Sequence, residues 1–365
     1  MNGWNRFWFS RADPLPLSMT RIGVGVLWLA VLTITAPNWH RFYGFDGILS
    51  LGDADLNKLR RLSTTSLMTL TDGVLPISFW WWIGLVLSIC VTIGFQSRLA
   101  TIGLFVFTSS LIQRNSSVVN GEELVTRMLL FYGCFSHWGD RLSLDAWIRN
   151  RKLAADANGF AKDTCSPQPF VWCWRMMQIN FLLIYAISLP NKFAQDMDWL
   201  TGDALHWTIA SDMWWTRGWL SELTLGFNGI LRKSLTWSTV LLEGLFPILV
   251  CFSRTRVPIT LCIMGLHLGI AFCIPGVTLF TLSMVVGSAM FLPLSAYTNL
   301  AELLRCGLRR AGVRNPPANW WHALRVARPE VRRACELLEI DAAISTPIAI
   351  ASSLPTSSCL LPSAL

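Results

Sequence analysis

The chain has 365 residues, of which 53% are hydrophobic and only 14% are charged. So few charged residues cannot cover a water-soluble globule, which excludes an ordinary soluble domain and predicts a polytopic membrane protein. The net charge of +8 requires no nucleic acid as partner, because basic segments beside membrane spans commonly face anionic lipid headgroups. Composition therefore predicts membrane lipid as the partner.

Uncharged stretches long enough to cross a bilayer, which takes roughly 20 apolar residues, predict an all-α transmembrane bundle of about eight spans. Pro275 and Gly276 divide the uncharged run after Val257 into two spans joined by a tight turn. Arg127 and Arg175 interrupt the fourth and fifth spans. The predicted spans are residues 15–36, 75–95, 98–116, 121–138, 169–190, 234–252, 256–275 and 277–298.

The first predicted span carries Arg21 in its early part and has no small-residue cleavage site after Thr35. It is therefore expected to be a membrane helix and not a signal peptide. A long arginine side chain near a helix end commonly reaches the headgroups, so we expect Arg21 to snorkel to the inner surface. A buried structural partner is the alternative.

Basic residues fall on one side of this arrangement. Residues 141–163 contain five Lys or Arg, and residues 302–341 contain eight arginines, whereas the loops 37–74 and 191–233 are balanced or slightly acidic. The positive-inside rule therefore predicts both termini in the cytoplasm. The expected organisation is a membrane domain at 1–300, a basic cytoplasmic segment at 301–341 and a disordered tail at 342–365.

All ten cysteines lie in predicted spans or on the predicted cytoplasmic side, and no C-x-x-C motif occurs. A quinone-coupled disulfide oxidase or reductase needs paired thiols near the outer face. That class of enzyme is therefore not expected.

Ionisable side chains gather in the outer half of the predicted bundle, on separate segments. One such charge is often a clamp between helices, but several together favour a functional polar cavity. The tryptophan-rich stretch from Asp196 to Trp219 is expected to contain short interfacial helices that cap this cavity. The residues concerned are Arg114, Glu122, Glu123, Arg127 and Lys192 near the outer face, Trp199 in the cap, and Glu243 and His267 at mid-depth.

Each of these residues also has a structural interpretation. Arg127 is expected to pair with Glu122 or Glu123 in preference to a ligand. An unpaired Glu243 at this depth would be expected to hold its proton, whereas a nearby cation, for which Lys192 and Arg127 are the candidates, would be expected to ionise it. No second histidine lies three or four residues from another within a predicted span, so no metal site is expected.

The order of these features resembles the HTTM (horizontally transferred transmembrane) domain, the membrane module of the vitamin K-dependent gamma-carboxylase family and its bacterial relatives. The resemblance covers about residues 1–300 and lies in the order of the elements, since none is specific alone. The elements are Arg21-Ile22-Gly23, Arg98-Leu99-Ala100, Gln113-Arg114-Asn115, Asn120 to Glu123 with Arg127, Leu142 to Trp147, Lys192, Asp198 to Ala204, Glu243 with Phe246-Pro247, and His267.

This resemblance implies a role for Lys192. In the carboxylase, a lysine just before an Asp-Trp-x-x-Gly segment is regarded as the base that deprotonates vitamin K hydroquinone, and Lys192 occupies the matching place before Asp198-Trp199. Partial removal from water favours the free amine that such a base requires. The resemblance thus implies reduced vitamin K or another quinone as cofactor, no metal, and the bacterial inner membrane as location.

Three functions are compatible with these features. The first is a stand-alone HTTM protein with a site for a quinone or another lipophilic ligand. The second is a true gamma-glutamyl carboxylase that receives its protein substrate through a partner, because the family's large extracytoplasmic domain has no counterpart among the basic residues after the last span. The third is a non-catalytic membrane scaffold or transporter, since a fold alone does not fix a function.

Overall fold

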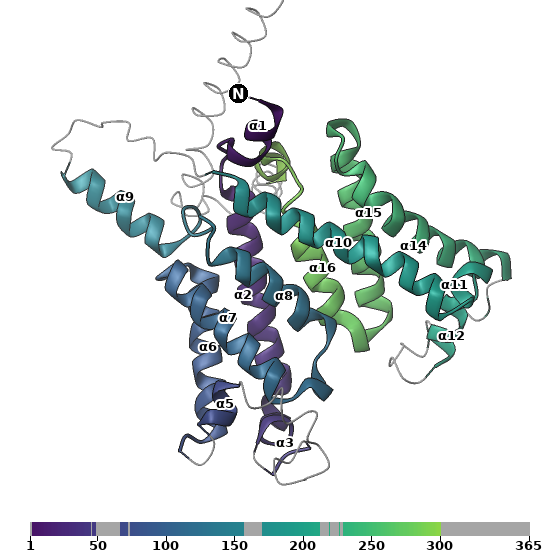
Figure 1. Ribbon diagram of the computed structural model, residues 1–365, viewed down its shortest axis with the longest axis horizontal. Helices are drawn as coiled ribbons and strands as arrows, with labels where there is room; N and C mark the ends of the chain where they lie inside the picture. Colours follow the sequence, from purple (N-terminus) through teal and green to yellow (C-terminus); the bar gives the residue numbers. More distant parts are fainter. Residues whose placement is uncertain are drawn as a thin grey trace, which may run out of the picture. The chain divides into compact units, whose positions relative to one another are not determined.

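Figure 1 shows the computed structural model of the protein, which describes residues 2–44, 46–48, 66–71, 74–156, 170–211, 219, 226 and 229–300. The predicted all-α class is confirmed for these residues, in which the only extended pairing is an isolated bridge between Arg11 and Phe170. Met1–Asn299 form one compact unit and Leu300–Leu365 a second. The expectations for residues 301–341 and 342–365 lie outside the described residues.

The described helices vary widely in length. In chain order they are α1 (Gly3–Phe9), α2 (Leu15–Thr35), η1 (Ala36–Asn38), α3 (Trp39–Tyr43), α5 (Leu67–Leu70), α6 (Ile77–Ile93), α7 (Ser97–Arg114), η3 (Ser116–Val118), α8 (Gly121–Gly133), α9 (Leu144–Asp156), α10 (Trp172–Gln195), α11 (Asp198–Thr201), α12 (Ala204–Ala210), α14 (Gly229–Leu249), α15 (Ser253–Cys273), η5 (Pro275–Val277) and α16 (Thr278–Ala289). The short helices predicted after Asp196 are present as α11 and α12.

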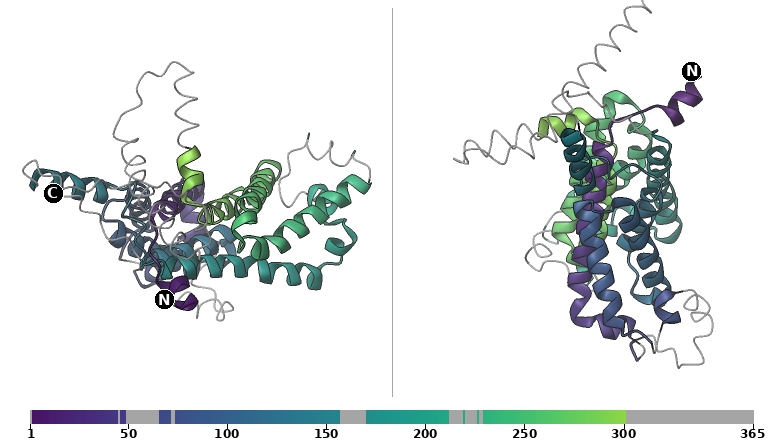
Figure 2. Two further views of the ribbon diagram at one scale, coloured as in Figure 1. Left: turned by 90° about the horizontal axis from the view of Figure 1, so that it is seen from above. Right: turned by 90° about the vertical axis from the view of Figure 1, so that its left-hand side faces the viewer.

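Within the first unit, α2 packs against α6 and α16, α7 packs against α6 and α8, and α15 packs against α14 and α16. Helices α3 and α5 lie at one end of α2, α6 and α7, whereas α1 and α9 lie toward the other end (Figures 1 and 2). Helix α10 runs from α1 to α11 and packs against α8 and α14 on its way. The long helices therefore separate two ends of the unit, as expected for a membrane bundle.

Among the described residues, two helical segments are long and apolar enough to cross a membrane, Leu15–Tyr43 and Ser253–Cys273. A third is obtained if Pro275–Ala289 and Leu294–Leu300, which are bent by 112°, count as one span. Other predicted spans fall short for physical reasons. Helix α8 has 13 residues, about 20 Å of helix against a hydrocarbon core of about 30 Å. Helix α10 is long enough, but polar residues are spread along it at Arg175, Gln178, Asn180 and Lys192. The count of eight spans stays a prediction.

One contact within the extended hydrophobic core joins α2 to α7 and α8. Trp28 of α2 is buried and donates its indole N–H to the hydroxyl oxygen of Thr126 at 3.1 Å. Its ring meets Phe107 edge to face, with the centroids 6.0 Å apart, a favoured arrangement for aromatic pairs. These contacts hold three helices together through one side chain.

Gly25 allows a close approach between α2 and α6. A Cβ atom at this position would lie 2.3 Å from Thr92 Oγ1 and 2.8 Å from the Thr92 backbone nitrogen, so the helices would have to move apart. We expect Gly25→Ala to lower the stability by about 1–3 kcal/mol, as for other overpacked sites, measured as thermal unfolding in detergent. Gly269 on α15 has open space around it, so Gly269→Ala is the matched control and should not destabilise. Equal effects of the two substitutions would contradict the close contact.

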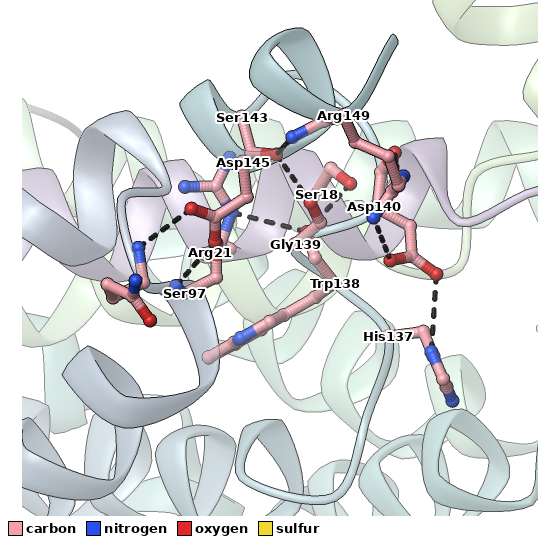
Figure 3. Close-up of polar contacts among 12 residues, drawn as sticks. Ser18, Arg21, Ser97, His137, Trp138, Gly139, Asp140, Ser143, Asp145 and Arg149 are labelled. Carbon is pink, nitrogen blue, oxygen red and sulfur yellow. Dashed lines mark hydrogen bonds and ion pairs between the residues drawn. The ribbon is translucent and has the colours of Figure 1, made fainter. Parts of the chain in front are cut away.

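Arg21 occupies a polar junction at the end of α2 that lies nearer α9 (Figure 3). Its side chain is fully buried and donates hydrogen bonds to the carbonyl oxygens of Val91, Thr92, Trp138 and Leu142. The expectation that Arg21 snorkels to the surface is therefore wrong, and the alternative, a buried structural partner, holds. Its guanidinium joins the last turn of α6, whose carbonyls lack intrahelical donors, to the segment before α9.

Asp145 connects α9 to α7 at the same junction (Figure 3). Its carboxylate accepts hydrogen bonds from the backbone N–H of Gln96 at 2.8 Å and of Ser97 at 2.7 Å, and from the Ser97 hydroxyl at 2.8 Å. Burial would raise the pKa of Asp145, but these hydrogen bonds, together with the charge of Arg21, lower that pKa below its usual value. The carboxylate thus caps the first turn of α7, where an anion is favoured.

Candidate functional site

Lys192 lies in the last turn of α10, two residues after Pro190, and its ammonium contacts two side chains from other helices. Lys192 Nζ donates a hydrogen bond to Glu243 Oε2 of α14, and it lies 4.5 Å from the centroid of the Trp199 ring of α11. The Lys192 side chain is 19% exposed and that of Glu243 10%. The structure therefore brings three of the predicted site residues together as a largely buried ion pair beneath an indole.

Contacts with α14 fix the position of α11, the helix that contains Trp199. The Trp237 indole N–H of α14 donates to the Leu200 carbonyl at 3.1 Å, and Lys233 pairs with Asp203 at 3.1 Å. Gly202 ends α11 with φ of +88°, a conformation that glycine adopts without steric cost. Contacts on both sides of Gly202 therefore fix α11 against α14 and place Trp199 over Lys192.

A second polar pair joins α10 to α15. The Tyr185 hydroxyl of α10 and His267 Nε2 of α15 are 2.9 Å apart, and both side chains are buried. The ring of Phe246 on α14 meets Tyr185 with centroids 5.1 Å apart. Tyr185 and Lys192 are seven residues apart, about two turns, and so lie on the same face of α10. Both Tyr185 and Lys192 thus contact α14 from this face, although the imidazole partner of Tyr185 lies on α15.

Tyr185 was not among the residues predicted for the site. The signal that could have found it is its spacing of seven residues from Lys192, which places both on one helical face. His267 Nδ1 is buried and has no hydrogen-bond partner, which is costly in an apolar interior. The pair therefore has unused capacity for one further hydrogen bond.

The remaining predicted residues lie at the C-terminal end of α7 and in the first two turns of α8. Arg114 is buried and donates to the carbonyl oxygens of Tyr43 at 3.1 Å and Gly44 at 2.8 Å, at the C-terminus of α3. Glu122 is buried and lies 3.4 Å from the amide nitrogen of Asn120. Arg127 is half-buried, and among the described side chains no ion pair joins it to Glu122 or Glu123. The expected Arg127 pair is therefore not formed.

Glu123 has a capping role in this second group. Its carboxylate accepts the backbone N–H of Asn120 at 2.8 Å and so closes a capping box at the start of α8. Within the described residues, no ion pair connects Glu122 or Arg127 to Lys192 or Glu243. The contacts thus divide the expected outer cavity into a structural group on α3, α7 and α8 and a separate ion pair between α10 and α14.

A small hollow of about 10 Å³, room for about one water molecule, lies elsewhere in the unit. Pro14, His137, Phe170 and Trp174 are among its lining residues, and it includes neither Lys192 nor Glu243. Within the part of the chain that the structure describes, no three His, Cys, Asp or Glu side chains converge as metal ligands. The side chains at Lys192 themselves offer charge, hydrogen bonding and proton transfer.

Lys192 Nζ contacts a carboxylate and the face of an indole, two groups that interact favourably with a cation. An ammonium can act as a base only after it has lost a proton, whereas a carboxylate can accept one directly. Lys192 and Glu243 therefore offer two different groups for a proton at one place.

Comparison of the chain with models of protein families, with curated proteins and with solved structures found no match.

Proposed function

We propose that this chain is a multi-pass membrane protein of the HTTM kind, with about eight spans and both termini in the cytoplasm. The separation of basic and balanced loops in the sequence and the helical bundle with two or three helices fit to cross a membrane support this proposal. So does the broad apolar exposure along α6 and α15, for example at Trp82, Val86 and Leu261, because such side chains suit lipid and not water.

We further propose that the pair of Lys192 and Glu243 binds a lipophilic ligand with an acidic hydroxyl group, such as a reduced quinone, and takes up its proton. The observation that carries this proposal is the largely buried ion pair of Lys192 Nζ and Glu243 Oε2 under Trp199. A buried ion pair is costly and adds little stability by itself. Ligand sites combine apolar and aromatic side chains with a few convergent polar groups, and the ion pair under Trp199 offers both.

The proton balance of this reaction is simple. The ligand hydroxyl gives its proton to the Glu243 carboxylate, which becomes a carboxylic acid, and the Lys192 ammonium stays to hold the resulting oxyanion. If Lys192 first passes its own proton to Glu243 and then accepts the proton of the ligand as a free amine, the same products form. The two routes differ in the role of Lys192, which is a fixed cation in the first and the base in the second.

Reduced vitamin K is the ligand that the family resemblance implies, and a further reaction with oxygen and carbon dioxide would make the protein a gamma-glutamyl carboxylase with a partner for its protein substrate. Binding of the ligand without turnover would leave a ligand-binding protein of the same fold. A scaffold or transporter would need neither the proton transfer nor the ammonium.

A hydroxynaphthalene tests the proton transfer directly, because it resembles a reduced naphthoquinone, is stable toward oxygen at neutral pH, and changes its absorption when it ionises. We expect the protein in phosphatidylcholine nanodiscs to bind it in the ionised form at a pH well below that at which it ionises in water. Glu243→Gln keeps the shape of the side chain but cannot take up the proton, so the bound ligand should stay neutral.

Asp140→Asn is the control for this experiment, since Asp140 is a carboxylate at the other end of the unit, paired with His137 and Arg149. It should leave the spectrum of the bound ligand unchanged. A neutral bound ligand in the unaltered protein, or no binding at all, would overturn the proposed function.

A further inference from the structure

The charges of α9 and the segment before it are unevenly distributed between the inside and the surface. Among the described side chains the acidic ones are engaged by neighbours, since Asp145 caps α7 and Asp140 lies 3.2 Å from His137 and 3.6 Å from Arg149. Arg151 and Lys152 are exposed. The charge that the described side chains of this helix present to their surroundings is therefore basic.

An exposed tryptophan accompanies these basic residues. Trp147 is 51% exposed, and the Arg151 guanidinium lies 5.3 Å from the centroid of its ring. The two residues are four positions apart and so lie one turn apart on the same side of α9. Tryptophan is enriched where a membrane meets water, because its ring is apolar and its N–H is polar. A tryptophan paired with an arginine offers one group for the acyl boundary and one for a phosphate.

The polar junction of Figure 3 sets the direction of α9. Asp145 binds the start of α7, the Ser143 hydroxyl accepts the Ala146 backbone N–H at 3.0 Å, and Arg21 holds the Leu142 carbonyl. From this junction α9 runs away from α6 and α7 at a wide angle (Figures 1 and 2). No described helix packs extensively against it. The outward face of α9 is thus held in a fixed direction without another described helix packed on it.

The surroundings of the junction indicate what meets this face. Ile93 at the end of α6, Phe95 in the turn and Leu99 at the start of α7 are large apolar side chains with substantial exposure, as expected of residues in contact with lipid. The start of α9 lies beside these residues, because Asp145 accepts hydrogen bonds from the backbone N–H groups of Gln96 and Ser97. A bilayer around α6 and α7 would therefore reach its headgroup level where α9 leaves the bundle.

We propose that α9 lies in the membrane surface and binds anionic phospholipid headgroups through Arg151 and Lys152, with Trp147 at the acyl boundary. The proposal rests on the membrane placement given under the proposed function, but not on the ligand chemistry of Lys192. Anionic lipid is the partner that matches all three features. The basic side chains require negative charge, and the exposed indole requires an apolar layer. The exposed apolar side chains of Ile93, Phe95 and Leu99 indicate that this layer lies beside the helix.

The test uses the full-length chain in nanodiscs of phosphatidylcholine that contain spin-labelled lipid. Electron paramagnetic resonance gives the association of labelled phosphatidylglycerol relative to labelled phosphatidylcholine. We expect the protein to prefer phosphatidylglycerol. The double substitution Arg151→Gln with Lys152→Gln should reduce this preference by up to about five-fold for each charge removed, and raised salt should reduce it as well.

The control removes two exposed arginines elsewhere on the predicted cytoplasmic side, Arg6→Gln with Arg254→Gln, and should retain most of the preference. The inference is overturned if the unaltered protein shows no preference, if both double variants lose it equally, or if the α9 variant keeps it. Binding of an acidic protein or a nucleic acid to α9 in place of lipid would also overturn it. The hydroxynaphthalene experiment contains no anionic lipid, so failure there is distinguishable from failure here.

Discussion

Replacing Lys192 by alanine is expected to lower the oxygen-dependent consumption of a reduced naphthoquinone by about 10²-fold or more, the usual scale for a positioned acid–base group. The reason is the contact of Lys192 Nζ with Glu243 Oε2 under the Trp199 ring, which is lost with the ammonium. Turnover is measured by absorbance in nanodiscs, with carbon dioxide supplied and with empty nanodiscs as the blank for uncatalysed oxidation.

The variant Lys192→Arg separates the two roles of Lys192. Arginine keeps a positive charge but does not release its proton in a protein. A rate within a few-fold of the original would identify Lys192 as the cation that holds the oxyanion. A loss as large as that of Lys192→Ala would identify it as the base. Unchanged turnover in Lys192→Ala would eliminate both roles.

Stability needs its own control in this experiment. Removing Lys192 leaves Glu243, whose side chain is 10% exposed, without its partner, and breaking a buried pair in this way is destabilising. The variant Lys192→Met with Glu243→Gln removes both charges and should unfold at a higher temperature than Lys192→Ala. If it nevertheless lacks turnover, the loss of activity comes from the missing charges and not from unfolding.

Replacing Arg21 by methionine is expected to be the most damaging single substitution for folding. It removes the donors to four carbonyl oxygens, those of Val91, Thr92, Trp138 and Leu142. The Trp138 carbonyl keeps the Ser18 hydroxyl at 2.8 Å. Each carbonyl left unpaired in the interior costs roughly 1–3 kcal/mol. We expect a total loss above about 4 kcal/mol, seen as a large fall in thermal stability in detergent.

The conservative variant Arg21→Lys provides the comparison. Its ammonium has three donors and lacks the fork of arginine, so it cannot span the α6 end and the 138–142 segment together. An intermediate stability is expected. A variant Arg21→Met with nearly unchanged stability would favour a side chain that reaches the headgroups instead of the buried position.

The hydrophobic pattern predicted several helices closely and failed where polar residues and turns compete with it. The span expected at residues 15–36 matches α2, and those at 75–95 and 98–116 match α6 and α7 within a few residues. The span expected at 121–138 ends early, because α8 stops at Gly133. The span expected at 277–298 is broken after Ala289, where Pro293 precedes a helix in a new direction.

The candidate site was only partly visible in the sequence. Depth along the predicted spans pointed to Lys192, Glu243 and His267, because charges in apolar segments are easy to recognise. Depth alone cannot say which side chains meet, since that depends on how helices rotate and pack. Arg114 and Glu122 have the same predicted depth, yet they bind the end of α3 and the start of α8. Tyr185 could not be predicted in this way, because an uncharged tyrosine in an apolar helix does not by itself indicate a polar site.

The ion pair of Lys192 and Glu243 has an electrical consequence. Its two charges sum to zero, and a neutral ligand that passes its proton to the pair leaves the sum at zero. Each elementary charge moved across a membrane is worth about 2.3 kcal/mol per 100 mV. Since binding carries no net charge into the field, the resting potential neither drives nor opposes it. For the ligand proposed above, a cell could therefore change its membrane voltage widely without changing how much of that ligand the pair binds.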